Sequence, residues 1–101
     1  MNTITKVSNI TYTDIAEYLR IAEVTDDDIN YINAIIGVAK AYILNYTGIK
    51  DLETLDNYAD MVIVVFVLCQ DMYDNRAMYV DNTNLNKVVD TILGMHQVNL
   101  L

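Results

Sequence analysis

The residue types that most often carry enzyme chemistry are scarce in this chain. Among its 101 residues, Cys69 is the single thiol and His96 is the single histidine. The two lie on different segments, and Cys69 stands inside an apolar run, where a cysteine behaves as a small buried hydrophobe. We interpret His96 as a solvated or interface group rather than as a catalytic base.

Three consecutive carboxylates, Asp26, Asp27 and Asp28, raise the question of a metal site. Consecutive side chains on a helix point around its axis and do not converge, and the D-x-[DN]-x-[DN]-G calcium loop is absent. Capping of a helix N-terminus explains the three residues better. No glycine-rich phosphate loop, nucleophile elbow or paired zinc ligands occur either. The sequence predicts a protein that is not an enzyme, with no catalytic residue, cofactor or metal.

The charge balance bears on the class of partner. Six Lys and Arg stand against 14 Asp and Glu, giving a formal charge of −8. Without a basic cluster, binding to nucleic acid through phosphate neutralisation is not expected. A membrane span needs about 20 apolar residues, and the longest run, at 61–69, is too short. Residues 1–9 lack the apolar centre of a signal peptide, and the lone cysteine fits a reducing cytoplasm.

The elements that would position these side chains are all helical by pattern. We expect one all-α domain over residues 1–101, with an N-terminal arm at 1–12 and a short tail at 95–101. Four helices are predicted, the last of them amphipathic, at 14–21, 25–48, 57–77 and 83–93, and the connections 48–56 and 79–82 are expected to be loops. Thr13 and Thr25 are the expected N-caps, and Gly48 and Gly94 the expected helix ends.

The second predicted helix carries two apolar stripes instead of one. The first is Ile29, Ile32, Ile36, Ala39, Ile43 and Tyr46; beside it lies the second, Tyr31, Ile35, Val38 and Tyr42. Such a helix is either central in its own domain or shared with a neighbouring subunit. The chain has eight tyrosines, which favour core edges and protein interfaces alike. The second stripe is therefore a candidate subunit interface, and the core-edge alternative stays open.

The run M-V-I-V-V-F-V-L-C at 61–69 has the valine content of a strand. Apolar residues nevertheless continue at helical spacing from Tyr58 to Tyr73, while Asp60, Asp71 and Asp74 stay polar. A segment near twenty residues long suits a helix. We expect the third helix to be central and apolar, and Arg76 to complement the dipole at its C-terminal end.

Several motifs in this order resemble one protein family. Residues 18–21 read Y-L-R-I, residues 26–28 read D-D-D, and the second helix ends A-K-A-Y-I-L-N-Y-T-G at 39–48. The third ends Q-D-M-Y-D-N-R at 70–76. Over residues 13–93 the chain is similar to the head-tail connector proteins of tailed phages and prophages, also called adaptor or head-completion proteins. Residues 94–101 are similar to the tail of such adaptors from Gram-positive phages.

The resemblance implies a structural protein that assembles as a ring, expected to be dodecameric, under the portal protein of the virion. A ring of this kind extends the DNA channel and docks the next head-completion or tail protein. It implies assembly in the host cytoplasm, with a free monomer until the portal templates the ring. Family members engage the portal through the C-terminal segment, here Met95, His96, Gln97, Val98, Asn99, Leu100 and Leu101. The chain departs from the family in lacking a proline before the third helix, where residues 53–57 stand.

Taken with the resemblance, the residues offer a self-interface for such a ring. It would comprise Tyr31, Ile35, Val38 and Tyr42, with Arg76 reaching a neighbour's carboxylate. The alternative hypothesis is a small acidic phage-encoded helical module that binds and regulates a host protein. A module of that kind is expected to remain a monomer or a dimer.

Overall fold

The computed structural model describes residues 4–98, and within them the fold is entirely helical. The prediction of an all-α chain is confirmed, but five α-helices stand where four were expected. They are α1 (Tyr12–Tyr18), α2 (Asp26–Thr47), α3 (Leu52–Leu55), α4 (Met61–Asp74) and α5 (Lys87–Met95). Two short 3-10 turns accompany them, η1 (Val7–Asn9) and η2 (Asn82–Asn84). None of the described helices is long and apolar enough to span a membrane.

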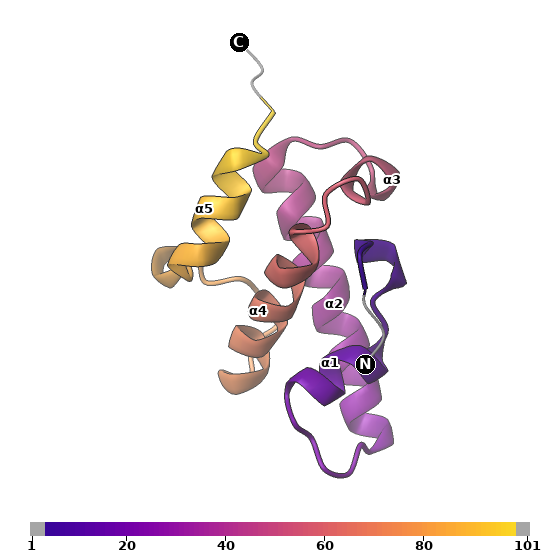
Figure 1. The fold of residues 1–101 in the computed structure, drawn as a ribbon. Helices are drawn as coiled ribbons and strands as arrows, with labels where there is room; N and C mark the ends of the chain where they lie inside the picture. Colours follow the sequence, from indigo (N-terminus) through magenta and orange to yellow (C-terminus); the bar gives the residue numbers. More distant parts are fainter. Residues whose placement is uncertain (1–3, 99–101) are drawn as a thin grey trace.

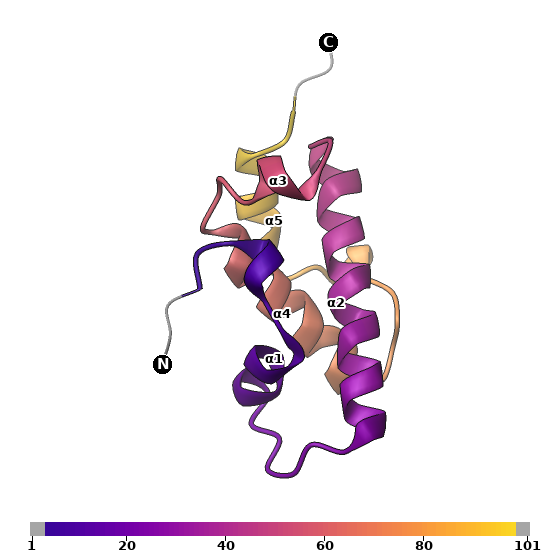
Figure 2. The same ribbon diagram turned by 90° about the vertical axis from the view of Figure 1, so that its right-hand side faces the viewer.

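The long helix α2 runs the length of the molecule, and the other helices gather on it (Figure 1). It packs against α4, α1 and α5, and α4 in turn contacts α5 and α1. Figure 1 shows α5 on one side of α4, with α3 and η1 on the opposite side. The view turned by 90° places α2 along one edge of the molecule, beside α4 (Figure 2). The core therefore lies between α2 and α4.

Helix α2 begins and ends where the sequence predicts. The Asp28 carboxylate accepts hydrogen bonds from the Thr25 backbone N–H and hydroxyl, both at 3.0 Å, and the Asp28 N–H donates to the hydroxyl of Thr25 at 3.1 Å. The Thr25 N–H is also the main reason that the pKa of Asp28 is lowered. At the other end Gly48 takes a φ of 77°, which a residue without a Cβ adopts at no steric cost.

Helix α4 is the apolar central helix, although it is shorter than the predicted 57–77. Val64, Val65 and Cys69 are fully buried. The helix ends in a Schellman motif, in which the Ala77 N–H bonds to the Met72 carbonyl at 2.9 Å and the Arg76 N–H to the Tyr73 carbonyl at 3.2 Å. Arg76 has a φ of 51°, so it cannot continue the helix.

Several bounds of the predicted helices are wrong, among them those of the first helix, which spans Tyr12–Tyr18 and not 14–21. Thr11 and not Thr13 caps α1, because the Asp14 carboxylate accepts from the Thr11 N–H at 2.8 Å, as in a capping box. The connection 48–56 is not a plain loop, because the Asp51 side chain caps the one-turn helix α3. Gly94 does not end the last helix, which begins after Asn86 and runs to Met95.

The N-terminal segment is joined to the core over its described part. Val7 is fully buried, and Ile10 is 5% exposed. The Asp56 carboxylate, just after α3, accepts from the Ser8 N–H at 3.0 Å and from the Ser8 hydroxyl at 2.5 Å. The hydroxyl bond is the first cause of the lowered pKa of Asp56. The described residues 4–11 therefore pack against the rest of the domain.

Candidate interaction surfaces

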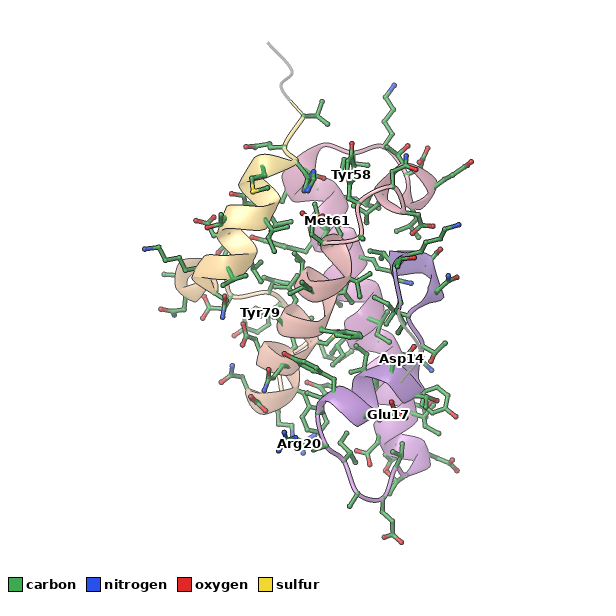
Figure 3. All side chains as sticks on the ribbon, in the orientation of Figure 1. Asp14, Glu17, Arg20, Tyr58, Met61 and Tyr79 are labelled. Carbon is green, nitrogen blue, oxygen red and sulfur yellow. The ribbon has the colours of Figure 1, made fainter. Side chains whose placement is uncertain are left out.

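The described part of the C-terminal segment is attached to the body of the molecule. Met95 is the last residue of α5. The His96 Nε2 lies 2.8 Å from an Asp60 carboxylate oxygen, and its ring lies 4.3 Å from the Tyr58 ring, centroid to centroid. Figure 3 shows Tyr58 where the C-terminal end of α5 meets the α3 side of the molecule.

Two further contacts continue this attachment beyond the end of α5. The Val98 N–H donates to the Thr47 carbonyl at 2.6 Å, and the Gln97 amide reaches the Tyr46 carbonyl at 3.5 Å. Residues 95–98 thus close over the C-terminal end of α2. The rest of the predicted portal-binding segment, Asn99, Leu100 and Leu101, lies outside the described residues.

The predicted interface stripe on α2 divides between core and surface. Ile35 is fully buried inside the chain, and Val38 is half-buried against the core. The Tyr31 hydroxyl lies 2.9 Å from the Met72 carbonyl and 2.6 Å from the Ala77 carbonyl, and burial raises its pKa. Ile35 is therefore wrong as an interface residue in this conformation, because its whole side chain serves its own core.

The two remaining interface candidates are more open. Tyr42 is half-buried, with its ring 6.0 Å from that of Tyr46. Arg76 is exposed, and its guanidinium carbon lies 4.4 Å from the centre of the Tyr73 ring. The structure does not bring Arg76 and Tyr42 into one site: Arg76 follows the C-terminal end of α4, whereas Tyr42 belongs to the C-terminal half of α2.

Helix α5 has an apolar face that its own chain does not cover. Val89 and Leu93 are fully buried, whereas Val88 is 55% exposed and Met95 is 69% exposed. Ile92 lies between the two exposed residues and is half-buried. The spacing of Val88, Ile92 and Met95 by four and three residues is a second helical stripe, like the one noted on α2. The sequence therefore held the signal for this face.

Two hollows lie along the connection between α4 and α5, the first beside the C-terminal end of α4 and the second beside α2 and α5. The first has a volume of about 290 Å³ and is lined by Leu68, Asp71, Met72, Asn75, Ala77, Tyr79, Val80, Asp81, Asn84 and Leu85. The second has a volume of about 390 Å³ and is lined by Tyr42, Tyr46, Asn82, Thr83, Leu85 and Asp90. Figure 3 shows Tyr79 beside α4 and below α5.

Cys69 and His96 form no hydrogen bond with each other within residues 4–98. Cys69 is fully buried in α4, and burial raises the pKa of its thiol to about 12, so the thiolate form is suppressed. His96 and Asp60 form a pair that could orient an imidazole, but no hydroxyl or thiol within residues 4–98 bonds to that ring. In the same range no three metal-ligating side chains converge.

Comparisons with protein-family models, with curated proteins and with solved structures find no match to this chain.

Proposed function

We propose that the chain is a structural head-tail connector of a tailed phage or prophage. In this proposal it assembles as a ring under the portal, extends the DNA channel and docks the next head-completion or tail protein. The proposal rests on the order of motifs from residue 13 to residue 93 and on the all-helical fold that carries them. No cofactor takes part.

The observation that supports assembly best is the uncovered apolar face of α5. Val88, Ile92 and Met95 form one stripe, and Val98, which is 43% exposed, follows it in the described tail. Exposed apolar side chains grouped on one face are typical of surfaces that a partner covers. If residues 95–101 bind the portal as proposed, the portal would cover this stripe together with the tail.

The charge of the chain suits a ring around DNA. At −8, its surface would repel the phosphates of a duplex passing through the ring, within the roughly 8–10 Å over which charges act at physiological salt. DNA would then slide without adhering. A reconstruction of the assembled ring tests this idea, and a lumen lined by lysine and arginine would contradict it.

The test of the proposal is assembly, with and without the portal protein of the same genome. Light scattering after size exclusion, over a range of concentrations, measures the mass in solution, and negative-stain images show any ring. We expect ring formation, on the portal if not alone. A chain that stays a monomer or dimer and does not attach to the portal would instead support the regulatory binding module.

Two variants locate the attachment surface. Deleting residues 97–101 keeps α5 complete, and we expect it to abolish portal attachment while the helical circular dichroism is unchanged. Replacing Val88 and Met95 by serine should weaken attachment. Ile63→Ser is the matched control, because Ile63 is 51% exposed on α4 and lies outside the stripe. If the truncated chain still attaches to the portal as the full chain does, residues 97–101 do not bind the portal.

A further inference from the structure

The two hollows described above form one continuous flank, because Leu85 lines both. In the first hollow the apolar floor is made by Leu68 and Met72, which are 1% and 2% exposed. Two carboxylates line the same hollow: Asp71 from the last turns of α4, and Asp81 from the connection to α5. The Asp81 oxygens also accept hydrogen bonds from the Thr83 N–H, the Asn84 N–H and the Asn84 amide, so they keep only part of their capacity for a ligand. Apolar floor and anionic wall together suit a side chain with an apolar stem and a cationic head.

Within residues 4–98, no lysine or arginine forms a salt bridge with the carboxylates that line the hollows. The one contact between a basic and an acidic side chain within residues 4–98 joins the His96 ring to Asp60, at the other end of α4. Burial and the neighbouring charges of Asp74 and Asp81 raise the pKa of Asp71. Lys87, at the start of α5, lines neither hollow. Asp71 is exposed at the mouth of the hollow, and the charges nearest to it in the same region are the carboxylates of Asp74 and Asp81.

The second hollow adds aromatic walls. The Tyr42 and Tyr46 rings lie 6.0 Å apart between centroids and are tilted by 44°. Asp90 lines the same space, and one of its oxygens lies 3.3 Å from the Tyr46 hydroxyl. Ring faces attract a cation, and a carboxylate beside them binds the edge of a planar guanidinium. Arginine stacks and pairs in this way better than lysine does.

We propose that this flank binds arginine side chains presented by a protein other than this chain. A second copy is a poor occupant, because each copy carries a charge of −8 and has only two arginines, Arg20 and Arg76. Arg76 already lies over its own Tyr73 ring. A basic partner surface is complementary to the hollows in charge. The proposal stands whether or not the chain forms a ring.

The test uses a small probe on the full chain. n-Butylguanidinium chloride is titrated into isotope-labelled protein at constant ionic strength and followed by NMR. We expect saturable shifts at Asn84, Leu85 and the rings of Tyr42 and Tyr46. Sodium butyrate, an anion of similar length, should leave these signals in place. Equal responses to both probes, or shifts spread over the whole acidic surface, would overturn the proposal.

Variants then assign the response to the hollows. Asp71→Asn and Asp90→Asn should each weaken probe binding by about three- to tenfold. Tyr42→Leu should weaken binding in the second hollow alone. Glu53→Gln removes an equal charge from exposed α3, on the opposite side of the molecule, and should have no effect (Figure 1). Circular dichroism verifies that each variant is folded.

Three outcomes would contradict this assignment. If Glu53→Gln weakened probe binding as much as Asp71→Asn does, the net charge of the chain and not the hollow would explain the binding. If a folded protein that carries both Asp71→Asn and Asp90→Asn bound the probe fully, the hollows would not be the binding site. Self-association of the wild type that disappears in Asp71→Asn would identify a second copy as the occupant.

Discussion

The two halves of helix α4 lie in opposite environments. From Met61 to Cys69 most side chains are buried between α2, α1 and α5. From Gln70 to Asp74 only Met72 is buried, and Asp71 lines an open hollow. A single helix thus supplies both the densest part of the core and part of a candidate binding surface. The first half is stabilised by apolar burial, which tolerates no charge, whereas the second half can change its charges at little cost.

The largest loss of stability is expected from a charge placed in the first half of α4. Val65→Asp places an unpaired carboxylate at a fully buried position and should cost at least about 4 kcal/mol, enough to unfold a domain of ordinary stability. Thermal unfolding by circular dichroism measures it. Ile63→Asp, two residues earlier at a 51% exposed position, should cost less than about 1 kcal/mol. Similar melting temperatures for the two variants would refute the contrast between buried and exposed sides of α4.

The reactivity of the Cys69 thiol measures how often the first half of α4 opens to solvent. Cys69 is fully buried, and its pKa is raised to about 12, so native protein should react with iodoacetamide at least about a thousandfold more slowly than unfolded protein. Mass spectrometry of the alkylated fraction over time gives both rates. Rapid alkylation of native protein at neutral pH would show that this half of α4 opens readily.

The C-terminal end of the second half is in contact with Tyr31 of α2. Its hydroxyl contacts the Met72 and Ala77 carbonyls at the C-terminal end of α4, so Tyr31→Phe should lower the free energy of unfolding by about 1 kcal/mol. Urea denaturation measures the change. Tyr79→Phe is the control, because Tyr79 is 69% exposed and should change stability by less than about 0.5 kcal/mol. Equal effects would mean that the hydroxyl of Tyr31 contributes nothing specific.

The smallest effect is expected at Asp71, in the second half. Its pKa is raised by burial first and then by Asp74 and Asp81, so the folded state disfavours the charged carboxylate. Asp71→Asn should therefore stabilise the protein slightly at pH 7, by less than about 0.5 kcal/mol. The gain should shrink as the pH falls through the raised pKa, because the wild-type carboxyl then becomes neutral as well. Destabilisation at pH 7 would show that the charge serves the fold.

Local signals in the sequence account for the helices that were predicted well. Helix α2 has a capping box at Thr25 and Asp28 and a glycine that takes a positive φ at its end, and both act over a few residues. The same T-x-x-D pattern stands at Thr11 and Asp14, so the sequence also contained the signal for an N-cap at Thr11, where Thr13 was predicted. Gly94 was predicted to end the last helix, but α5 continues to Met95. A glycine only weakens a helix, and burial of the neighbouring Leu93 stabilises this one.

The candidate surfaces were less predictable, because they depend on residues that are distant in the sequence. Periodicity identified Tyr31, Ile35, Val38 and Tyr42 as one stripe, but only tertiary packing buried Ile35 and left Tyr42 beside a hollow. Nothing in the spacing of His96 and Asp60 indicates their 2.8 Å contact. Both outcomes depend on how whole helices are placed against one another.

The sequence by itself determined the helical class, the bounds of α2 and the central, apolar character of α4, because caps and hydrophobic periodicity act within a few turns of a helix. Only the tertiary structure decided which stripe of each helix is covered and that the end of α4, the connection after it and α2 together enclose two acidic hollows. The physical reason is that burial is a property of neighbours in space, and here these neighbours are far apart along the chain.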